Sequence, residues 1–303
     1  MRLGCLTANL RQRQFALPKF RFSGRQPLKV IGRNLAMLNE ARKPPPNRGP
    51  SDGFIGSLRF AIRRFLDLQV SSVGADLAPW LKERAGSLLE VGCGDQPYRH
   101  MLPDRCAYTG LDWEGSVAEF SVERLSDVVY YKGDIFPFTD RSFDALFHTE
   151  VIEHIANYRL FLKECHRVLK PGGELMFTVP FQARFHFIPV DFWRFTKSGL
   201  ELILAEAEFS DIRVQPRGSD LVVACYKVVS VLYRSAYGGI LGKTVFVVFS
   251  WLTVLLLCLA HLCMALKLGS PDDCLGYSVF ASRPRSQTTS RHGPFGAGSD
   301  ALG

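Results

Sequence analysis

The sequence predicts an α/β protein whose mostly parallel sheet carries helices on both faces. Strand-like apolar runs alternate with helical segments between about residues 78 and 217, as in a chain of parallel βα units. The first run leads into a glycine loop, Gly92-Cys93-Gly94, at the kind of sheet edge where open α/β folds bind ligands. Acidic residues also recur near the ends of successive strand-like runs.

Composition limits the class of protein further. The chain has 303 residues, 47% hydrophobic and 22% charged, which excludes a wholly disordered or collagen-like protein. Residues 1–53 hold 11 of the 37 basic residues but only two acids, and the rest of the chain is nearly neutral. We therefore expect no nucleic acid partner for the folded part. The eight cysteines form no Cys-x-x-Cys pair, so we expect reduced thiols, a cytoplasmic compartment and no metal site.

The two ends of the chain differ from its middle. Residues 1–52 are predicted to form a basic, disordered arm; a transit peptide, a surface-binding arm and a misplaced start codon are the origins left open. Residues 285–303 are predicted to be a disordered tail. Residues 54–69 place apolar side chains at three- and four-residue steps between arginines. This spacing predicts an amphipathic helix that covers the domain or, as the alternative, lies on a membrane.

Five strands and two helices are predicted for the central region. The strands are placed at residues 87–91, 107–111, 128–131, 143–148 and 174–179. A helix is predicted at 158–169, where Pro171, Gly172 and Gly173 would end it and turn the chain into the next strand. A second helix is predicted to begin after Thr196, a favourable N-cap residue.

The acids near the strand ends have a regular spacing. Glu90 lies in the first strand, Asp112 follows 22 residues later, and Asp134 follows after another 22. A carboxylate at the end of the second strand can accept hydrogen bonds from both hydroxyls of a ribose, and glycines let the backbone approach the ligand. The spacing indicates a ribose-containing ligand, with ordinary loop acids as the alternative.

Six ordered motifs resemble those of the class I S-adenosylmethionine-dependent methyltransferases, especially the bacterial type 11-like group. They are Glu90-Val91-Gly92-Cys93-Gly94, Gly133-Asp134-Ile135, Phe136-Pro137-Phe138, Ser142-Phe143-Asp144, Glu150-Val151-Ile152-Glu153-His154-Ile155 and Val168-Leu169-Lys170-Pro171-Gly172-Gly173. The resemblance covers roughly residues 78–217 and a last strand at 276–282. It implies a Rossmann-like methyltransferase sandwich with a mostly parallel seven-stranded sheet, closed by antiparallel strands at 212–215 and 276–282.

The resemblance also implies S-adenosylmethionine as the cofactor and suggests which residues bind it. Glu90, Gly92, Cys93 and Gly94 would shape the methionine side, Asp112 would hold the ribose, Trp113 would flank the adenine, Asp134 would bind the adenine amino group beside Ile135, and Thr149 and Glu150 would lie near the amino acid end.

One feature departs from the family pattern. The common third glycine is absent, because the loop continues as Asp95-Gln96-Pro97. Pro97 suits the first turn of a helix, so we expect an altered loop that still binds the cofactor. A Rossmann oxidoreductase is the competing prediction. It would need the missing helix-opening glycine and would leave Asp134 and Glu153-His154 unexplained.

Two segments are predicted to face the methyl acceptor. Methyl transfer mainly requires alignment and exclusion of water, and a base only when the acceptor is a hydroxyl or an acidic carbon. His154 is the candidate base, with packing or capping of the next helix as the alternative. Residues 185–196 hold five aromatic residues, Trp193 among them, together with His186, Asp191 and Arg194. This segment indicates a wall over the acceptor pocket, or else aromatic packing on the sheet.

A long apolar segment interrupts the predicted domain, which would comprise residues 53–217 and 276–284. Residues 245–266 carry no formal charge and as one helix would rise about 33 Å, enough for a hydrocarbon core of roughly 30 Å. Because residues 218–275 would be inserted between neighbouring strands, they must leave and return on one side. We expect a helical hairpin that re-enters or lies on a membrane. A protein-buried subdomain, a dimer interface and a true membrane anchor are the alternatives.

The sequence thus predicts a methyltransferase docked at the cytoplasmic face of a membrane, with an amphiphilic or lipid-linked acceptor such as an envelope glycan. One alternative is a methyltransferase for a small soluble metabolite that uses the insertion to form a homodimer. Another is a non-catalytic scaffold that retains the cofactor pocket.

Overall fold

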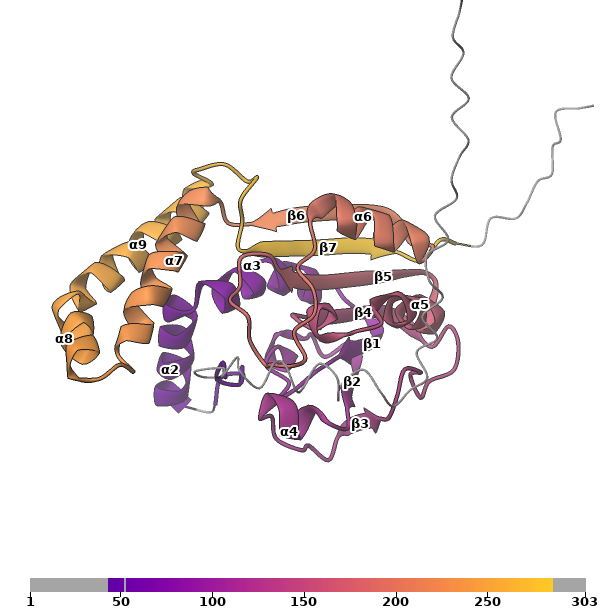
Figure 1. Ribbon diagram of the computed structural model, residues 1–303. Coiled ribbons are helices and arrows are strands. Elements are labelled where there is room, and N and C mark those ends of the chain that lie inside the picture. Colours follow the sequence, from indigo (N-terminus) through magenta and orange to yellow (C-terminus); the bar gives the residue numbers. More distant parts are fainter. Residues whose placement is uncertain (1–42, 52, 286–303) are drawn as a thin grey trace, which may run out of the picture. The chain divides into compact units, whose positions relative to one another are not determined.

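The computed structural model describes residues 43–51 and 53–285, and their core is a seven-stranded sheet (Figure 1). The strand order is β3-β2-β1-β4-β5-β7-β6. The strands are β1 (Gly86–Val91), β2 (Cys106–Trp113), β3 (Val128–Tyr131), β4 (Phe143–Thr149), β5 (Leu169–Pro180), β6 (Ser210–Arg217) and β7 (Gly276–Ser282). β1 to β5 pair in parallel, and β7 pairs antiparallel with β5 and β6. The predicted mostly parallel seven-stranded sheet is confirmed. Both of its last two strands form antiparallel pairs, but only β7 is reversed, and β6 runs in the same direction as β1 to β5. The predicted arm and tail lie largely outside the described residues.

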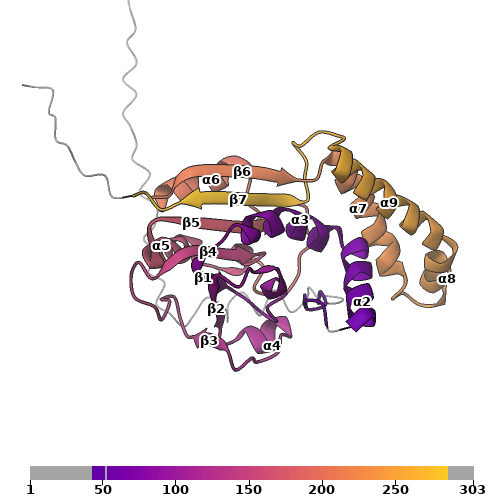
Figure 2. The ribbon, with the colours of Figure 1, turned by 180° about the vertical axis from the view of Figure 1, so that it is seen from behind.

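Helices cover both faces of the sheet (Figures 1 and 2). They are α3 (Leu68–Lys82) on one face and α5 (Tyr158–Val168) and α6 (Lys197–Glu206) on the other, with the short α4 (Ser116–Phe120) after β2. Leu88 and Met176 pack with α3, whereas their neighbours Leu89 and Phe177 pack with α5 and α6. Neighbouring residues pack against different helices because successive side chains of a strand point to opposite sides of the sheet. α6 begins after Thr196, whose hydroxyl accepts from the N–H of Gly199, as predicted.

The passage from α5 into β5 differs from the prediction. α5 ends at Val168, and Leu169 already pairs with Phe143 of β4. Gly172 has φ +80° and donates its N–H to Arg283 O over 2.8 Å. The Pro-Gly-Gly segment is therefore an irregular part of the strand and not a turn before it. Backbone pairing beyond the end of β7 supplies the hydrogen bonds that a free turn would lack.

The amphipathic segment forms α2 (Gly53–Leu66), and Asp67 caps the separate helix α3 by accepting from the N–H groups of Gln69 and Val70. Phe54 is 81% exposed, and only Gly56 of α2 is buried. The prediction that this helix covers the domain is therefore wrong for most of its length. The helix contacts the rest of the protein through Phe60, whose ring lies 5.4 Å from that of His100, and through Phe65, whose ring stacks on His261 at 5.0 Å.

Three helices form the insertion between β6 and β7: α7 (Asp220–Ser235), α8 (Ile240–Val248) and α9 (Ser250–Leu266). The apolar run predicted as one helix is broken at Phe249, where α8 and α9 are inclined by 53°. The Ser250 hydroxyl donates to Val247 O over 2.8 Å, a local hydrogen bond of the kind that competes with helix continuation. Within the described residues, no single helix has both the length and the hydropathy to cross a membrane; α8 and α9 reach both only as a bent pair.

The insertion begins and ends at the edge of the sheet where the parallel strands end. Gly276, the first residue of β7, pairs with Pro180 at the end of β5 and with Arg217 at the end of β6. The glycine loop after β1 belongs to the same edge, because β1, β4 and β5 run in parallel. α7 and α9 pack along each other, and α2 lies beside this group in both views (Figures 1 and 2).

Candidate functional site

The glycine loop after β1 has a backbone that only glycine accommodates at its first position. Gly92 and Cys93 donate their N–H groups to Leu111 O over 2.8 and 3.2 Å. Gly92 has φ +68°, and a Cβ on it would lie 2.6 Å from Cγ2 of Val151. Gly94 also has a positive φ, +49°, but a Cβ there would meet only Val122 at 3.4 Å. The loop therefore holds its backbone close to β2 and to the segment after β4.

Asp112 joins this loop to the end of β2. Its Oδ2 accepts from the N–H of Gly94 over 2.9 Å, and its Oδ1 accepts from the N–H of Trp113 over 2.7 Å. The side chain is buried, and burial raises the pKa of Asp112 although the two N–H donors oppose the shift. Each oxygen keeps lone-pair capacity for a second donor. The structure thus brings together Gly94, Asp112 and Trp113. It fixes the Asp112 carboxylate at the edge of the sheet where the parallel strands end, which we call the carboxyl edge.

Glu90 lies in β1, the strand that pairs with β2, and its side chain is buried. The Tyr108 hydroxyl donates to Glu90 Oε2 over 2.5 Å. Burial raises the pKa of Glu90 to about 8, so the carboxyl group is mostly protonated at neutral pH. The neighbouring Cys93 is also buried. Both side chains therefore lie in the protein interior beneath the glycine loop.

The residues predicted to surround an adenine lie at the ends of β2 and β3. Trp113 pairs with Tyr131 across these strands, and its indole, 41% exposed, packs over Gly115. Asp134 and Ile135 follow β3 and are exposed. Three of the predicted residues thus share one side of the carboxyl edge, where they are accessible to a ligand.

Thr149 and Glu150 lie at the end of β4, and Glu150 has a partner that the sequence did not indicate. Glu150 has φ +53°, and its Oε1 accepts from Nη2 of Arg217 over 2.7 Å. Arg217 is buried and also donates to the Ser72 hydroxyl over 2.9 Å. The pair links the end of β4 to the end of β6. Proximity of β6 to β4 depends on the sheet order, so no local pattern in the sequence reveals it.

The segment 185–196 is tied together by one buried acid. Arg194 donates to both oxygens of Asp191 over 2.6 and 2.7 Å, and the His186 N–H donates to Oδ2 over 3.0 Å. Burial would raise the pKa of Asp191, but hydrogen bonds from His186 and Arg194 lower it below its usual range. Phe192 and Trp193 donate their N–H groups to Glu153 O over 2.8 and 3.2 Å. These bonds fasten the segment to the turn after β4.

His154 lies in that turn, a single 3-10 turn at Ile152–His154, and not in α5. Its Nδ1 lies 2.7 Å from Val190 O, and its ring is 5.0 Å from that of His186 and 5.1 Å from that of Phe120. Burial lowers the pKa of His154 to about 4, which makes the neutral imidazole a weak proton acceptor. The structure therefore brings His154 and His186 together. It also adds Phe120 and Glu153, which the sequence analysis did not select.

Part of the predicted arm contacts the glycine loop. Arg48 lies 2.8 Å from an oxygen of Asp95 and 2.7 Å from one of Glu123, and Asn47 donates to the Tyr98 hydroxyl over 3.1 Å. Residues 48–51 line a cavity of about 550 Å³ with Asp95 and nearby residues. Residues 47–51 thus lie against the loop that the sequence assigns to the cofactor.

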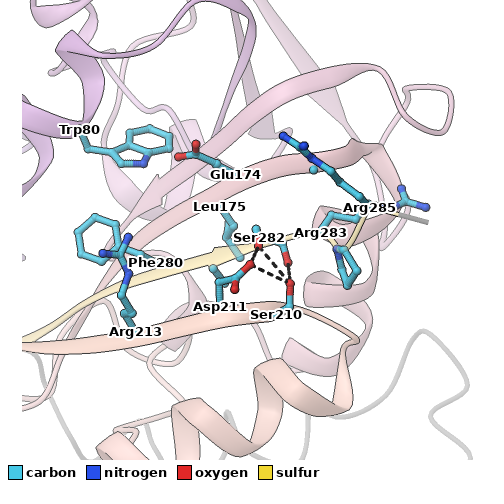
Figure 3. Close-up of a pocket in the computed structure, with 13 residues that line it drawn as sticks. Trp80, Glu174, Leu175, Ser210, Asp211, Arg213, Phe280, Ser282, Arg283 and Arg285 are labelled. Carbon is cyan, nitrogen blue, oxygen red and sulfur yellow. Dashed lines mark hydrogen bonds between the residues drawn. The ribbon is translucent and has the colours of Figure 1, made fainter. Parts of the chain in front are cut away.

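A second cavity, of about 430 Å³, lies at the opposite edge of the sheet (Figure 3). It is lined by the first residues of β5 and β6 and the last of β7, and the Ser210 and Ser282 hydroxyls donate to the Asp211 carboxylate. None of the residues selected from the sequence lines it. We therefore assign the functional site to the carboxyl edge.

Part of the chain is similar to known methyltransferases. Residues 89–177 match the family model described as a methyltransferase domain. A fatty-acid O-methyltransferase of Mycolicibacterium smegmatis is 34% identical over 98 residues, which are 30% of this chain and 36% of that protein. A demethylmenaquinone methyltransferase of Thermotoga maritima is 36% identical over 133 residues, which are 39% of this chain and 57% of that protein. The chain thus spans between about a third and just over half of the length of these relatives.

Solved structures include an S-adenosylmethionine-dependent methyltransferase of Thermotoga maritima. It is 15% identical with a TM-score of 0.44, over 76% of this chain and 96% of that one. The ordered motifs, the seven-stranded sheet and the family-model match identify residues 89–177 as part of a class I S-adenosylmethionine-dependent methyltransferase domain.

Proposed function

We propose that the chain transfers a methyl group from S-adenosylmethionine to an amphiphilic or lipid-linked acceptor at the cytoplasmic surface of a membrane. The use of S-adenosylmethionine is supported above all by the position of the Asp112 carboxylate. Two N–H groups hold it at the end of β2 beside the glycine loop. A carboxylate fixed in this way accepts both ribose hydroxyls without a reorganisation cost. The exposed Trp113 and Ile135 are available to flank the adenine.

The residues at the carboxyl edge would bind and orient the reactants. S-adenosylmethionine supplies an electrophilic methyl group when it is bound. The chain's part is to place the acceptor in line with that methyl group and to exclude water. The segment 185–196, fastened to the turn after β4, forms an ordered wall for this purpose. The low pKa of His154 argues against our prediction that this residue is the base.

The insertion supports an apolar acceptor and a membrane surface. Apolar side chains of α2 and of α7 to α9 are exposed on the group of helices that adjoins the carboxyl edge, among them Phe54, Ile240, Leu241, Val247 and Trp251. From Leu221 to Leu268 the chain has four basic residues, all exposed, and no acidic ones. α2 likewise has three arginines and no acid. Asp220, the exposed first residue of α7, is the one acid in these helices. Exposed apolar side chains with mostly positive charges fit an anionic lipid surface.

The relatives' names agree with this class of acceptor only in part. Two are named for fatty acids and for phthiotriol dimycocerosates, whereas another is named for demethylrifamycin. The acceptor proposal therefore rests mainly on the position of the exposed apolar helices. A direct test incubates the full chain with methyl-labelled S-adenosylmethionine and either the lipid or the aqueous extract of the source cells. We expect label in lipid products only; label confined to water-soluble products would contradict the acceptor class.

Docking is tested by sedimentation of the full chain with vesicles of phosphatidylglycerol and phosphatidylethanolamine. The variant carrying Ile240→Asp and Trp251→Asp should lose most of its vesicle binding. The control Leu202→Asp changes an exposed apolar residue of α6 and should bind as the unmodified chain does. A folded, unmodified chain that ignores vesicles, or that forms a dimer through these same helices, would contradict docking.

A further inference from the structure

The Glu153 carboxyl group lies buried in the turn after β4. The side chain is fully buried, and neither oxygen has a hydrogen-bond partner among the described residues. His154 Nε2 lies 3.7 Å from Glu153 Oε1, too far for a hydrogen bond. Because buried polar groups are rarely left unpaired, this group calls for an additional partner.

Two imidazoles adjoin Glu153, and both have Nδ1 beside oxygen acceptors. His154 Nδ1 lies 2.7 Å from Val190 O. His186 Nδ1 lies 2.9 Å from Arg184 O and 3.1 Å from Asp191 Oδ2. Nη2 of Arg194 lies farther from His186 Nδ1, at 3.4 Å. With Nδ1 of each ring donating to the nearer oxygens, Nε2 of each ring keeps a lone pair. Metal-binding histidines are oriented in the same way, by donation from the other ring nitrogen to a carbonyl or a carboxylate.

The three side chains are close enough to share one ion. One ligand atom from each of Glu153, His154 and His186 lies within 4.8 Å of the others. Ligands bound at about 2.0–2.2 Å from one metal lie roughly 3–4 Å apart, so modest side-chain rotations suffice. We propose that Glu153, His154 and His186 bind a divalent transition-metal ion. Two imidazoles and one carboxylate favour Zn²⁺, Fe²⁺ or Co²⁺ over Mg²⁺ and Ca²⁺, which prefer oxygen ligands.

The position of this site relates it to the acceptor. Val151, two residues before Glu153, fills the space beside Gly92 of the glycine loop. His186 belongs to segment 185–196, which we propose as a wall of the acceptor site and which is hydrogen-bonded to Glu153 O through Phe192 and Trp193. Three protein ligands leave coordination positions open, and an oxygen of the acceptor can occupy one of them. Binding of the ion itself is measured without cofactor or acceptor, so this inference stands apart from the proposed function.

The test uses the full chain, stripped of metal by a chelator and titrated with Co²⁺ and with Zn²⁺. We expect each chain to bind one metal ion, and we expect bound Co²⁺ to give a visible absorption band. Glu153→Gln, His154→Ala and His186→Ala should each weaken Zn²⁺ binding by more than about 100-fold. Asp191→Asn, which removes the charge that orients His186, should weaken it by roughly 10- to 100-fold. His166→Gln, a half-buried histidine of α5 outside the cluster, should have no effect.

X-ray absorption of the unmodified, Zn²⁺-loaded chain keeps the test independent of how the variants fold. We expect nitrogen and oxygen neighbours at about 2.0–2.1 Å, with scattering from two imidazole rings. Absence of stoichiometric binding, a sulfur neighbour, or unchanged affinity in the folded His154 and His186 variants would overturn the proposal.

Discussion

Arg217 Nη2 lies 2.7 Å from Glu150 Oε1, although these residues lie at the ends of β6 and β4, two strands that do not pair with each other. The side chain of Arg217 is completely buried, and Glu150 occupies a positive φ directly after β4. The pair therefore connects the root of the helical insertion with the edge that carries the predicted cofactor residues.

Arg217→Met should lower the free energy of unfolding by about 3–5 kcal/mol, because it leaves the half-buried Glu150 without its cation. Combining it with Glu150→Gln should cost less than the sum of the single changes, with a coupling of about 0.5–3 kcal/mol. Denaturant unfolding of the four proteins measures this. Arg213→Met, an exposed change in the same strand, is the control. Strict additivity would show that the two side chains do not interact.

Gly92→Ala should be worse than Gly94→Ala, although both residues have positive φ. The left-handed backbone costs an alanine about 1–2 kcal/mol at either site. Only at Gly92 does the new Cβ also meet Val151 at 2.6 Å, which adds about 1–3 kcal/mol. Thermal unfolding of both variants checks the order, and equal losses of stability would mean that Val151 moves aside freely.

Stability should fall with rising pH because of Glu90. Its pKa is raised from 4.5 to about 8 by burial, so the folded chain keeps a proton that the unfolded chain has released. The associated stability is complete below the unfolded pKa and is lost as pH rises through about 8, by up to roughly 1.4 kcal/mol per pH unit. Glu90→Gln, which mimics the protonated carboxyl, should flatten this dependence between pH 5 and 8. Parallel pH curves for both proteins would contradict the buried, protonated state.

The sequence was sufficient for much of the fold. The predicted strand 128–131 and last strand 276–282 agree with β3 and β7, and Thr196 caps α6 as expected. These elements depend on apolar runs, glycine and capping, which act locally. The break at Phe249 and the strand-like Pro-Gly-Gly segment were missed, because local hydroxyl bonds and pairing with neighbouring strands decide them.

The candidate site was predictable to a similar extent. Asp112 and Gly94 lie together because the first and second strands pair in parallel, which the βα pattern indicates. The pairing of Glu150 with Arg217 and the proximity of His186 to Glu153 were not predictable. Arg217 lies in β6 and His186 follows β5, and only the tertiary fold brings them to the end of β4.

The most direct test of the central claim is calorimetric titration of the full chain, in mild detergent, with S-adenosylmethionine and separately with a reduced nicotinamide dinucleotide. We predict binding of S-adenosylmethionine alone. Asp112→Ala should lose at least about tenfold in affinity for each charge-assisted hydrogen bond removed, and Asp104→Ala, a change in an exposed turn, should lose none. A folded chain that binds neither ligand, or an Asp112→Ala variant with unchanged affinity, would contradict the assignment of this edge as the cofactor site.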